Sequence, residues 1–489
     1  MQSFNLVQPR GIEAAVSAAA MPHSKYIAGG SDLMQLMKDN VETPEHLVDL
    51  EQLPLGGVTV GRSGLRLAAM ARLSTEMLYA CPNVAVTRRL VAINAGLPTY
   101  MRAPGESSGN FALESAIDEL AVSLKRDPLQ FRIQNYTEQD PHENKPFASK
   151  MLRACYQQSA VLFGWSRRMP EPRSMRNGRM LMGWGVATST YRTNQRPAQV
   201  RVRFTADGTV LVQSGTQDVG TGTYTVMSQV AGDAPGVPVE HVRFQLGDSR
   251  FPPAPVSGGS STVPSVAPAV LAACQALRAK IFDLARRSER PGWQPVPADA
   301  LKLQNGSVVA PGGSIAIGAL LAQNGQGAVE ADAGSALDAT PNHFSRHAFG
   351  AQFAEVVVNP DLGTIRVNRW VGAFDGGLIL NAKTGRSQLI GGITYGIGMA
   401  LSEETLVDGE TGRIVNANIA EYLVPVNADV PDIQAIFVPN EEHNSNPSGV
   451  KGIGELPMVG VAAAIANAVY HATGVRVRKV PIRIEDVLS

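Results

Sequence analysis

The chain has 489 residues, with 43 basic residues, 43 acidic residues and three cysteines. This length predicts two or more domains, because a single hydrophobic core stops growing at roughly 250–300 residues. The balanced charge argues against nucleic acid and against an anionic membrane surface as partners. The cysteines Cys81, Cys155 and Cys274 lie far apart, which argues against an iron–sulfur cluster or a disulfide framework and favours buried structural thiols.

The chain start and the apolar runs predict a soluble cytoplasmic protein that does not cross a membrane. No apolar run reaches the roughly 18 residues that a membrane helix needs. The first residues also lack the order of a signal peptide, in which a basic segment precedes an apolar one.

Residues 1–77 are predicted to form a small α/β unit. The expected elements are an extended start at Phe4–Val7, a helix over Gly11–Ala20, a strand over 25–30, a helix over Asp32–Met37 and strands near His46–Asp49 and Leu65–Ala69. Gly29, Gly30 and Ser31 lie between a strand and a helix, where free backbone N–H groups favour an anionic phosphate. The alternative for these residues is a simple tight turn.

The sequence pattern of the first unit ends between Ser74 and Val86, and the segment Met77–Pro82 resembles a junction between two units. This predicts a domain boundary after residue 77. The next region, residues 78–180, is expected to hold a loop with Arg102 and then a helix that Ser107 or Ser108 could cap. Arg102 could stabilise an oxyanion, or it could donate hydrogen bonds to loop carbonyls.

Two further regions, residues 181–340 and 341–489, complete an α+β fold. The first is expected to contain strands at 200–204, 209–215 and 241–247, helices at Thr225–Ala231 and Ala267–Arg287, and an irregular polar stretch up to Asn342. The second is expected to contain a hairpin with its turn at Asn359–Gly363, a glycine-studded helix over 387–404 and a loop leading into a buried helix over 452–474.

Four loops rich in glycine or hydroxyl residues precede predicted helices, at 215–227, 256–265, 387–398 and 451–457. Each loop alone is ordinary helix capping. Together they offer the backbone N–H groups and hydroxyls that a large polar cofactor with a phosphate and a pterin ring requires.

Glu455 is the acidic residue of greatest interest, because it lies in an apolar loop that opens a nearly all-apolar helix. It could serve as a general base, or its charge could stabilise the helix dipole. His343 and His347 have the spacing of metal ligands but lack a third ligand, so a zinc site is not expected. No serine lies in the strand–turn–helix elbow of a serine hydrolase.

Five segments occur in a characteristic order over about four fifths of the chain. They are LPTYMRAPGESSGNFALESAIDELA, QDVGTGTYTVMSQVAG, PPAPVSGGSSTVPSV, SQLIGGITYGIGMALSEE and GVKGIGELPMVGVAAAIANAV. In these segments the chain resembles the molybdopterin-binding large subunit of the xanthine dehydrogenase and aldehyde oxidase family, the molybdenum hydroxylases. The resemblance implies a multi-lobed α+β fold, a molybdenum–molybdopterin cofactor and hydroxylation of aldehydes or N-heterocycles with water as the oxygen source. It also implies that electrons pass to iron–sulfur and flavin subunits.

The resemblance assigns roles to particular residues. Glu455 is implied to be the catalytic base, and Arg102 is implied to orient the substrate and stabilise its developing charge. The residues implied to hold molybdopterin are Gly220, Thr221, Gly222, Thr223, Ser257, Gly258, Gly259, Ser260, Ser261, Thr262 and Gln388.

Residues 1–77 resemble instead the opening of the family's flavin-binding subunit, in which the loop matching Gly29, Gly30 and Ser31 wraps the FAD pyrophosphate. This resemblance ends near Ser74. The rest of that subunit and the first half of the molybdenum subunit have no counterpart here, which predicts an in-frame chimera that binds FAD poorly and molybdopterin at reduced occupancy.

Two alternatives to a molybdenum hydroxylase remain open. One is a folded remnant that binds cofactor or partners without turnover. The other is a cofactor-free hydrolase of small esters or lactones that uses Glu455 or a loop serine. An apolar face left uncovered would favour a homo-oligomer.

Overall fold

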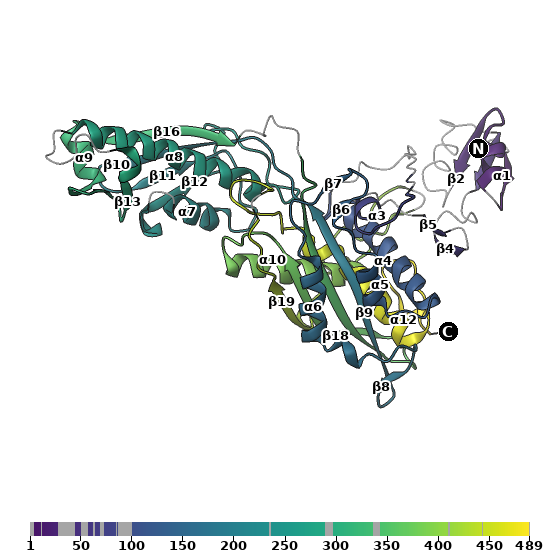
Figure 1. Ribbon diagram of the computed structural model, residues 1–489. Coiled ribbons are helices and arrows are strands. Elements are labelled where there is room, and N and C mark those ends of the chain that lie inside the picture. Colours follow the sequence, from purple (N-terminus) through teal and green to yellow (C-terminus); the bar gives the residue numbers. More distant parts are fainter. Residues whose placement is uncertain are drawn as a thin grey trace.

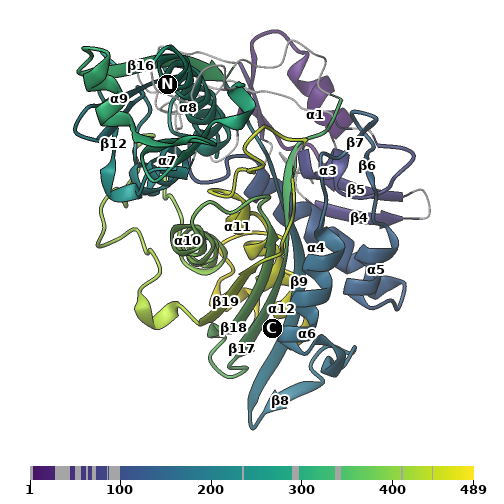
Figure 2. The same ribbon diagram turned by 60° about the vertical axis from the view of Figure 1, so that its left-hand side comes forward.

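The computed structural model describes residues 4–10, 12–27, 45–49, 57–61, 64–68, 73–84, 86, 100–233, 236–288, 297–335, 343–408, 411–442 and 444–488. A central body around a long sheet continues into an elongated second lobe, and a small unit holds the N-terminus (Figures 1 and 2). Helices and strands are mixed throughout, as expected of an α+β fold.

A five-stranded sheet in the order β19-β18-β17-β9-β8 forms the central body. Its strands are β8 (Met175–Asn177), β9 (Met180–Arg192), β17 (His347–Val358), β18 (Ile365–Asp375) and β19 (Asp432–Phe437). The antiparallel pair of β17 and β18 confirms the hairpin, since the Asn359 N–H bonds the Thr364 carbonyl across the turn at 3.0 Å. The parallel pairing of β19 with β18 was not expected.

Helices cover both faces of this sheet. Alternate residues of β17 enter two different cores, Phe349, Ala351 and Phe353 on one face and Ala348 and Ala354 on the other. This period of two is that of a strand buried on both sides. The helices of the central body are α3 (Leu73–Met77), α4 (Glu106–Ser123), α5 (Pro128–Gln134), α6 (Leu152–Phe163), α10 (Ala382–Leu401), α11 (Leu456–Val459) and α12 (Val461–Thr473).

Two glycines let α12 pack closely on β9. A Cβ atom at Gly183 would lie 1.9 Å from the Ala468 carbonyl oxygen, and one at Gly185 would lie 2.2 Å from that of Ala464. Because real Cβ atoms never approach so closely, the helix could not reach the strand without glycine at both positions. The close packing fixes the loop that precedes α12 relative to the sheet.

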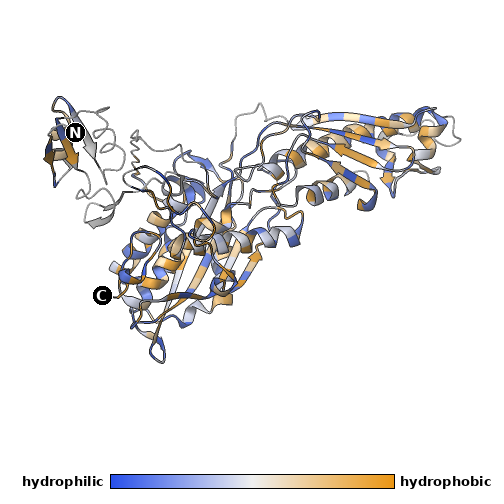
Figure 3. Ribbon diagram, turned by 180° about the vertical axis from the view of Figure 1, so that it is seen from behind, coloured by the Kyte–Doolittle hydropathy of each residue, from blue (hydrophilic) through white to orange (hydrophobic). Residues whose placement is uncertain are grey.

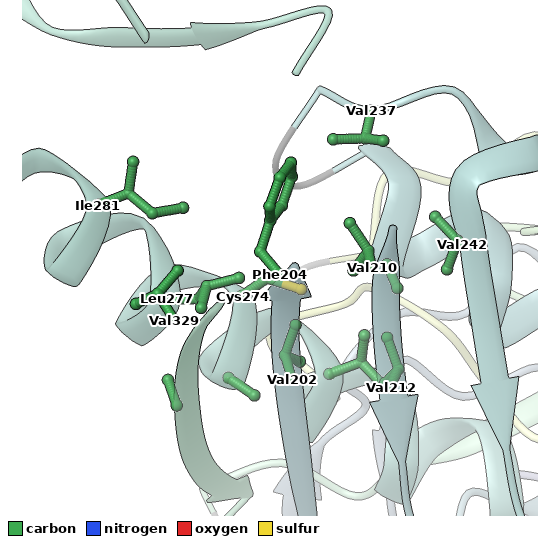
Figure 4. Packing of buried hydrophobic residues seen from close by; sticks show 14 of the residues in the cluster. Val202, Phe204, Val210, Val212, Val237, Val242, Cys274, Leu277, Ile281 and Val329 are labelled. Atoms are coloured by element: carbon green, nitrogen blue, oxygen red, sulfur yellow. The ribbon is translucent and has the colours of Figure 1, made fainter. Parts of the chain in front are cut away.

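The second lobe contains a four-stranded sheet in the order β12-β11-β10-β16. Its elements are β10 (Ala198–Thr205), β11 (Val210–Gln213), α7 (Thr223–Asp233), β12 (Val242–Gln245), α8 (Thr262–Arg287) and β16 (Ala328–Ser335). Val202, Phe204, Val210 and Val212 of the sheet face Leu277 and other residues of α8 in one hydrophobic cluster (Figure 4). Apolar residues are correspondingly frequent along the strands of both lobes (Figure 3).

The stretch expected to be irregular up to Asn342 is instead largely ordered secondary structure. It contains β13 (Lys302–Gln304), β14 (Ser307–Ala310), β15 (Gly313–Ala316), α9 (Ile317–Gln323) and β16. Strands β13 to β15 are short, and β16 carries acidic and small residues on its outer side, so the local pattern does not reveal them. Their pairing with one another and with β10 stabilises them.

The boundary predicted at residue 181 falls inside β9, which pairs with β17 of the central sheet. The second lobe therefore runs from β10 to β16 rather than from residue 181. The remaining elements are β6 (Gln139–Asp140), β7 (Lys145–Pro146) and the short 3-10 helices Trp165–Arg167, Val239–His241, Ala298–Ala300, Asn427–Asp429 and Ile484–Asp486.

The N-terminal unit has the predicted α/β character. Its described elements are β1 (Asn5–Val7), α1 (Ile12–Ala19), β2 (Ser24–Ile27), β3 (His46–Asp49), β4 (Gly57–Gly61) and β5 (Gly64–Ala68). Strands β1, β3 and β2 form a parallel sheet, and β4 pairs with β5. Gly29, Gly30, Ser31 and the helix expected over residues 32–37 lie outside the described residues.

Two described helical stretches are long and apolar enough to cross a membrane by length and composition, Thr262–Arg287 and Leu456–Thr473. The expectation that no stretch would reach this length is therefore wrong. In the apolar 18-residue part of each stretch, 61% of the first and 94% of the second is buried inside the protein. Both stretches pack in hydrophobic cores, and buried helices of this kind also meet the length criterion.

A buried polar network joins α4, α5 and β9. The Arg132 guanidinium donates to a Glu114 carboxylate oxygen at 2.8 Å, and both side chains are fully buried. The Tyr79 hydroxyl and the backbone N–H of Thr188 also donate to this carboxylate. Burial first, and then the charge of Glu114, raise the pKa of Tyr79 well above its usual value. A buried charge is tolerated here because every partner is present.

Candidate functional site

A cavity of about 430 Å³ lies between the second lobe and the central body. The second lobe contributes the loops before α7 and α8, and the central body contributes the start of α10 and the loop before α11. Arg102, Gln388 and Glu455 all line this cavity. So do most of the other residues expected to bind the cofactor, namely Thr221, Gly222, Thr223, Ser257, Gly258, Gly259, Ser260 and Thr262.

Three helices begin at this cavity. The first residues of α7 and α8, Thr223 and Thr262, line it directly, and so does Asn381, which caps α10. The N-cap residue of α8, Ser261, makes no side-chain capping hydrogen bond. Helix N-termini carry a partial positive charge and unsatisfied N–H groups, so they favour a bound anion. The cavity is therefore suited to a phosphate-bearing ligand.

Glu455 lies at one end of the cavity with both carboxylate oxygens hydrogen-bonded. The backbone N–H of Ala103 donates to Oε1 at 3.2 Å, and the Ser260 hydroxyl donates to Oε2 at 2.9 Å. Glu455 comes directly before α11, but its side chain makes no capping hydrogen bond to that helix. A side chain held by residues from two distant loops is a candidate general base rather than a helix cap.

Arg102 joins the loop of Glu455 to α10. Its Nε donates to the Gly454 carbonyl at 2.7 Å, and its Nη2 donates to the Gln388 carbonyl at 3.0 Å. Burial lowers the pKa of Arg102, while the charge of Glu455 raises it. The expected contact with loop carbonyls is thus confirmed, and the same guanidinium also faces the cavity.

The loop before α8 satisfies most of its hydroxyls internally. Ser257 and Thr262 hydrogen-bond one another at 2.9 Å, and Ser261 donates to the Gly258 carbonyl at 2.8 Å. The cavity wall here is therefore formed largely by backbone, which glycine leaves accessible. Ser261 itself is not among the residues that line the cavity.

The loop before α7 is organised by Asp218. Its carboxylate accepts the N–H groups of Gly220 at 2.8 Å, Gly222 at 3.3 Å and Tyr224 at 3.3 Å. Burial opposes ionisation of Asp218, but these backbone donors lower its pKa overall. Gly220 does not line the cavity, whereas Thr221, Gly222 and Thr223 do. At Gly222 the backbone has φ +88°, which favours glycine.

A family model described as a molybdopterin cofactor-binding domain matches residues 158–431. This chain belongs to the molybdenum hydroxylase family. A second model with the same description matches residues 48–136, a range that crosses the boundary predicted after residue 77. The flavin-subunit resemblance of residues 1–77 stays a prediction.

Among similar curated proteins is the aldehyde oxidoreductase molybdenum-binding subunit PaoC of Escherichia coli, 38% identical over 418 residues that are 85% of this chain and 55% of that protein. A xanthine dehydrogenase molybdenum-binding subunit of Escherichia coli is 31% identical over 430 residues, covering 83% of this chain and 55% of its own length. The chain thus spans about half the length of the curated relatives it matches.

Two solved structures share the fold. Quinoline 2-oxidoreductase from Pseudomonas putida aligns with a TM-score of 0.71 at 22% identity, over 79% of this chain and 52% of that one. A Cu,Mo-CO dehydrogenase aligns with a TM-score of 0.69 at 20% identity, over 79% of this chain and 52% of that one. At these identities the likeness concerns the architecture alone.

The cavity residues fit the cofactor of a molybdenum hydroxylase. Gly258 and Gly222 line the cavity without side chains, and a Cβ atom at Gly258 would have no atom within 4 Å. Among the described residues that line the cavity, Glu455 has the one carboxylate, and Arg102 and Lys451 have the cationic side chains. The charge of Lys451 is balanced by its buried partner Asp375, so an anionic, flat and polar molecule is favoured here by the glycine-rich walls and the helix N-termini.

Three residues near Glu455 or in the cavity wall were not predicted individually from the sequence. Tyr191, at the end of β9, has its pKa raised by burial and by the charge of Glu455. Glu106, in the first turn of α4, has its pKa raised by burial and also by Glu455. Lys451 lines the cavity and forms a fully buried ion pair with Asp375 at 2.8 Å. No local sequence pattern indicates that a residue at a strand end or a buried lysine will interact with a distant carboxylate. The interactions with Glu455 and Asp375 therefore become visible only in the folded structure.

The geometry bears on several smaller expectations. Burial lowers the pKa of His347 to about 3. The expectation that His343 and His347 bind no zinc stays a prediction. Ser107 and Ser108 lie inside α4 rather than capping it, because the helix begins after Gly105. Cys81 is exposed, against expectation, while Cys155 and Cys274 are buried.

Proposed function

We propose that this chain binds molybdenum–molybdopterin in the cavity between its lobes and hydroxylates aldehydes or N-heterocycles there. One observation carries the proposal. Arg102, Gln388 and Glu455, which come from three distant segments, line one cavity together with the starts of three helices. A cavity of this kind, with a few polar groups converging on it, is the usual form of a cofactor site.

When bound, the cofactor supplies an acceptor for two electrons and the oxygen that is transferred to the substrate. The N-terminus of α8 would hold the phosphate, since its backbone donors have no side-chain cap. The Gln388 amide would hydrogen-bond the pterin from the wall of the cavity. Glu455 would accept the proton that leaves as the carbon–oxygen bond forms, and Arg102 would stabilise negative charge on the substrate.

Electron transfer would require partner proteins. The chain has three cysteines, and the described residues include no group of three metal-binding side chains, so iron–sulfur and flavin subunits would take the electrons. The relatives are themselves named as subunits. A partner surface would include the exposed apolar residues between α10 and β19, which are Leu406, Val407, Ile414, Val415, Ile419, Leu423, Val424 and Val426. A second copy of the chain is the other candidate for this surface.

The proposal is tested by oxidation of a panel of aldehydes and N-heterocycles with an artificial dye as electron acceptor. Protein produced with molybdenum is expected to turn over at least one substrate class, and protein produced with tungstate is expected to be inactive. Turnover that is equal in both preparations would contradict the proposal. Metal-independent hydrolysis of a small ester or lactone would favour the hydrolase alternative.

A further inference from the structure

Ser260 and Glu455 hydrogen-bond each other twice. The Ser260 hydroxyl donates to the Glu455 carboxylate at 2.9 Å, and the Glu455 backbone N–H donates to the Ser260 hydroxyl at 3.0 Å. One residue lies in the loop before α8 and the other in the loop before α11. The Ser260 hydroxyl is the donor in one bond and the acceptor in the other, and the pair links the two lobes.

The backbone around this contact permits an unusually close approach. A Cβ atom at Gly452 would lie 2.5 Å from the Ser260 carbonyl oxygen, and one at Gly454 would lie 3.2 Å from the Ser260 hydroxyl oxygen. Ser260 itself has φ +54°, in the left-handed region that is unfavourable for serine by about 1 kcal/mol. Glycine would adopt this backbone conformation with less strain, so the feature that serine contributes at this position is its hydroxyl group.

The other hydroxyls of the loop have different partners. Ser257 pairs with Thr262, and Ser261 bonds the Gly258 carbonyl. Ser260 is thus the loop residue whose side chain reaches Glu455 in the described structure. Since the Ala103 N–H holds the other carboxylate oxygen at 3.2 Å, the carboxylate is fixed at both ends.

We propose that Ser260 is a positioning residue that holds the Glu455 carboxylate in the orientation needed to accept a proton, and that its hydroxyl serves Glu455 rather than the cofactor. The inference rests on the proposed function of Glu455 as the base. A long, flexible glutamate would otherwise lose orientation each time the cavity exchanged its contents. Fixing it beforehand leaves fewer degrees of freedom to restrict during the reaction.

The test compares Ser260→Gly with Ser261→Ala in the full, cofactor-free chain. Glycine removes the hydroxyl while suiting the left-handed backbone, so the variant is expected to fold. Infrared spectra of protein with isotope-labelled glutamate, minus those of Glu455→Gln, isolate the carboxylate stretch of Glu455. We expect this band to shift in Ser260→Gly and to stay in place in Ser261→Ala. The Glu455 amide is also expected to exchange roughly 10-fold faster in Ser260→Gly.

An unchanged band together with unchanged amide exchange in Ser260→Gly would overturn the proposal. Because these readouts need no cofactor, they are independent of whether the chain is a hydroxylase. In cofactor-loaded protein, Ser260→Gly is expected to lower kcat roughly 10-fold with KM within about twofold and pterin content unchanged. Loss of pterin from this variant would assign the hydroxyl to the cofactor and would also overturn the proposal.

Discussion

Glu455→Gln is expected to lower kcat for hydroxylation by roughly 10²–10⁴-fold, the usual contribution of a positioned general base. Glutamine has nearly the same shape. Its amide oxygen can still accept the Ala103 N–H, and the Ser260 hydroxyl can turn to accept from the new NH₂ group. The fold and the cavity should therefore persist, while the capacity to take up a proton is lost. Steady-state kinetics of cofactor-loaded protein measure the effect.

Glu106 provides a matched control. Its carboxyl group is partly buried in the first turn of α4, and its pKa is raised by burial and by the charge of Glu455, but it does not line the cavity. Glu106→Gln is expected to change kcat by less than about threefold. If Glu455→Gln retained molybdenum and pterin and kept its rate within that same range, Glu455 would not be the base.

Arg132→Met is expected to lower the free energy of unfolding of the central body by about 3–5 kcal/mol, the usual effect of removing one partner of a buried ion pair. Methionine fills much of the space of the arginine stem but leaves the Glu114 carboxylate buried without its cation. The donors that remain, the Tyr79 hydroxyl and the Thr188 N–H, supply no positive charge. Urea unfolding followed by tryptophan fluorescence measures the change, because Trp165 and Trp184 belong to the same core.

The control for this variant is an ion pair at the surface. Arg478 pairs with Glu119 at 2.7 Å, and its side chain is 43% exposed. Arg478→Met is expected to change stability by less than about 1 kcal/mol, since solvent screens exposed pairs. Equal effects of the two substitutions would show that burial of the Arg132 pair does not matter.

Elements with a strong local pattern could be predicted from the sequence. Strand His46–Asp49 follows from the β-forming apolar pair Leu47 and Val48, and the hairpin turn at Asn359–Gly363 follows from a turn sequence between two apolar segments. The buried helix α12 follows from an almost unbroken apolar run. Strands β13 to β16 could not be predicted, because β13, β14 and β15 have only three or four residues each and β16 is stabilised by pairing with the distant strand β10.

The candidate site, too, could be predicted from the sequence only in part. Glycine-rich loops before helices indicated a cofactor cavity, and the structure gathers Arg102, Gln388 and Glu455 around it. The contact of Ser260 with Glu455 joins loops 195 residues apart, and Tyr191 reaches the same carboxylate from the end of a strand. Nothing in the local sequence of either residue signals these contacts, which depend on how the two lobes meet.

The molybdenum and pterin content of the purified chain tests the central claim most directly, by elemental mass spectrometry and by fluorescence of the oxidised pterin. The matched control is Gly258→Trp, which adds a bulky side chain to a cavity-lining position where a Cβ atom would meet no atom within 4 Å. We expect molybdenum and pterin in equimolar amounts in the natural chain and loss of both in the variant. Absence of both from the natural chain, under conditions that load another molybdenum enzyme, would contradict the claim that this cavity binds the cofactor.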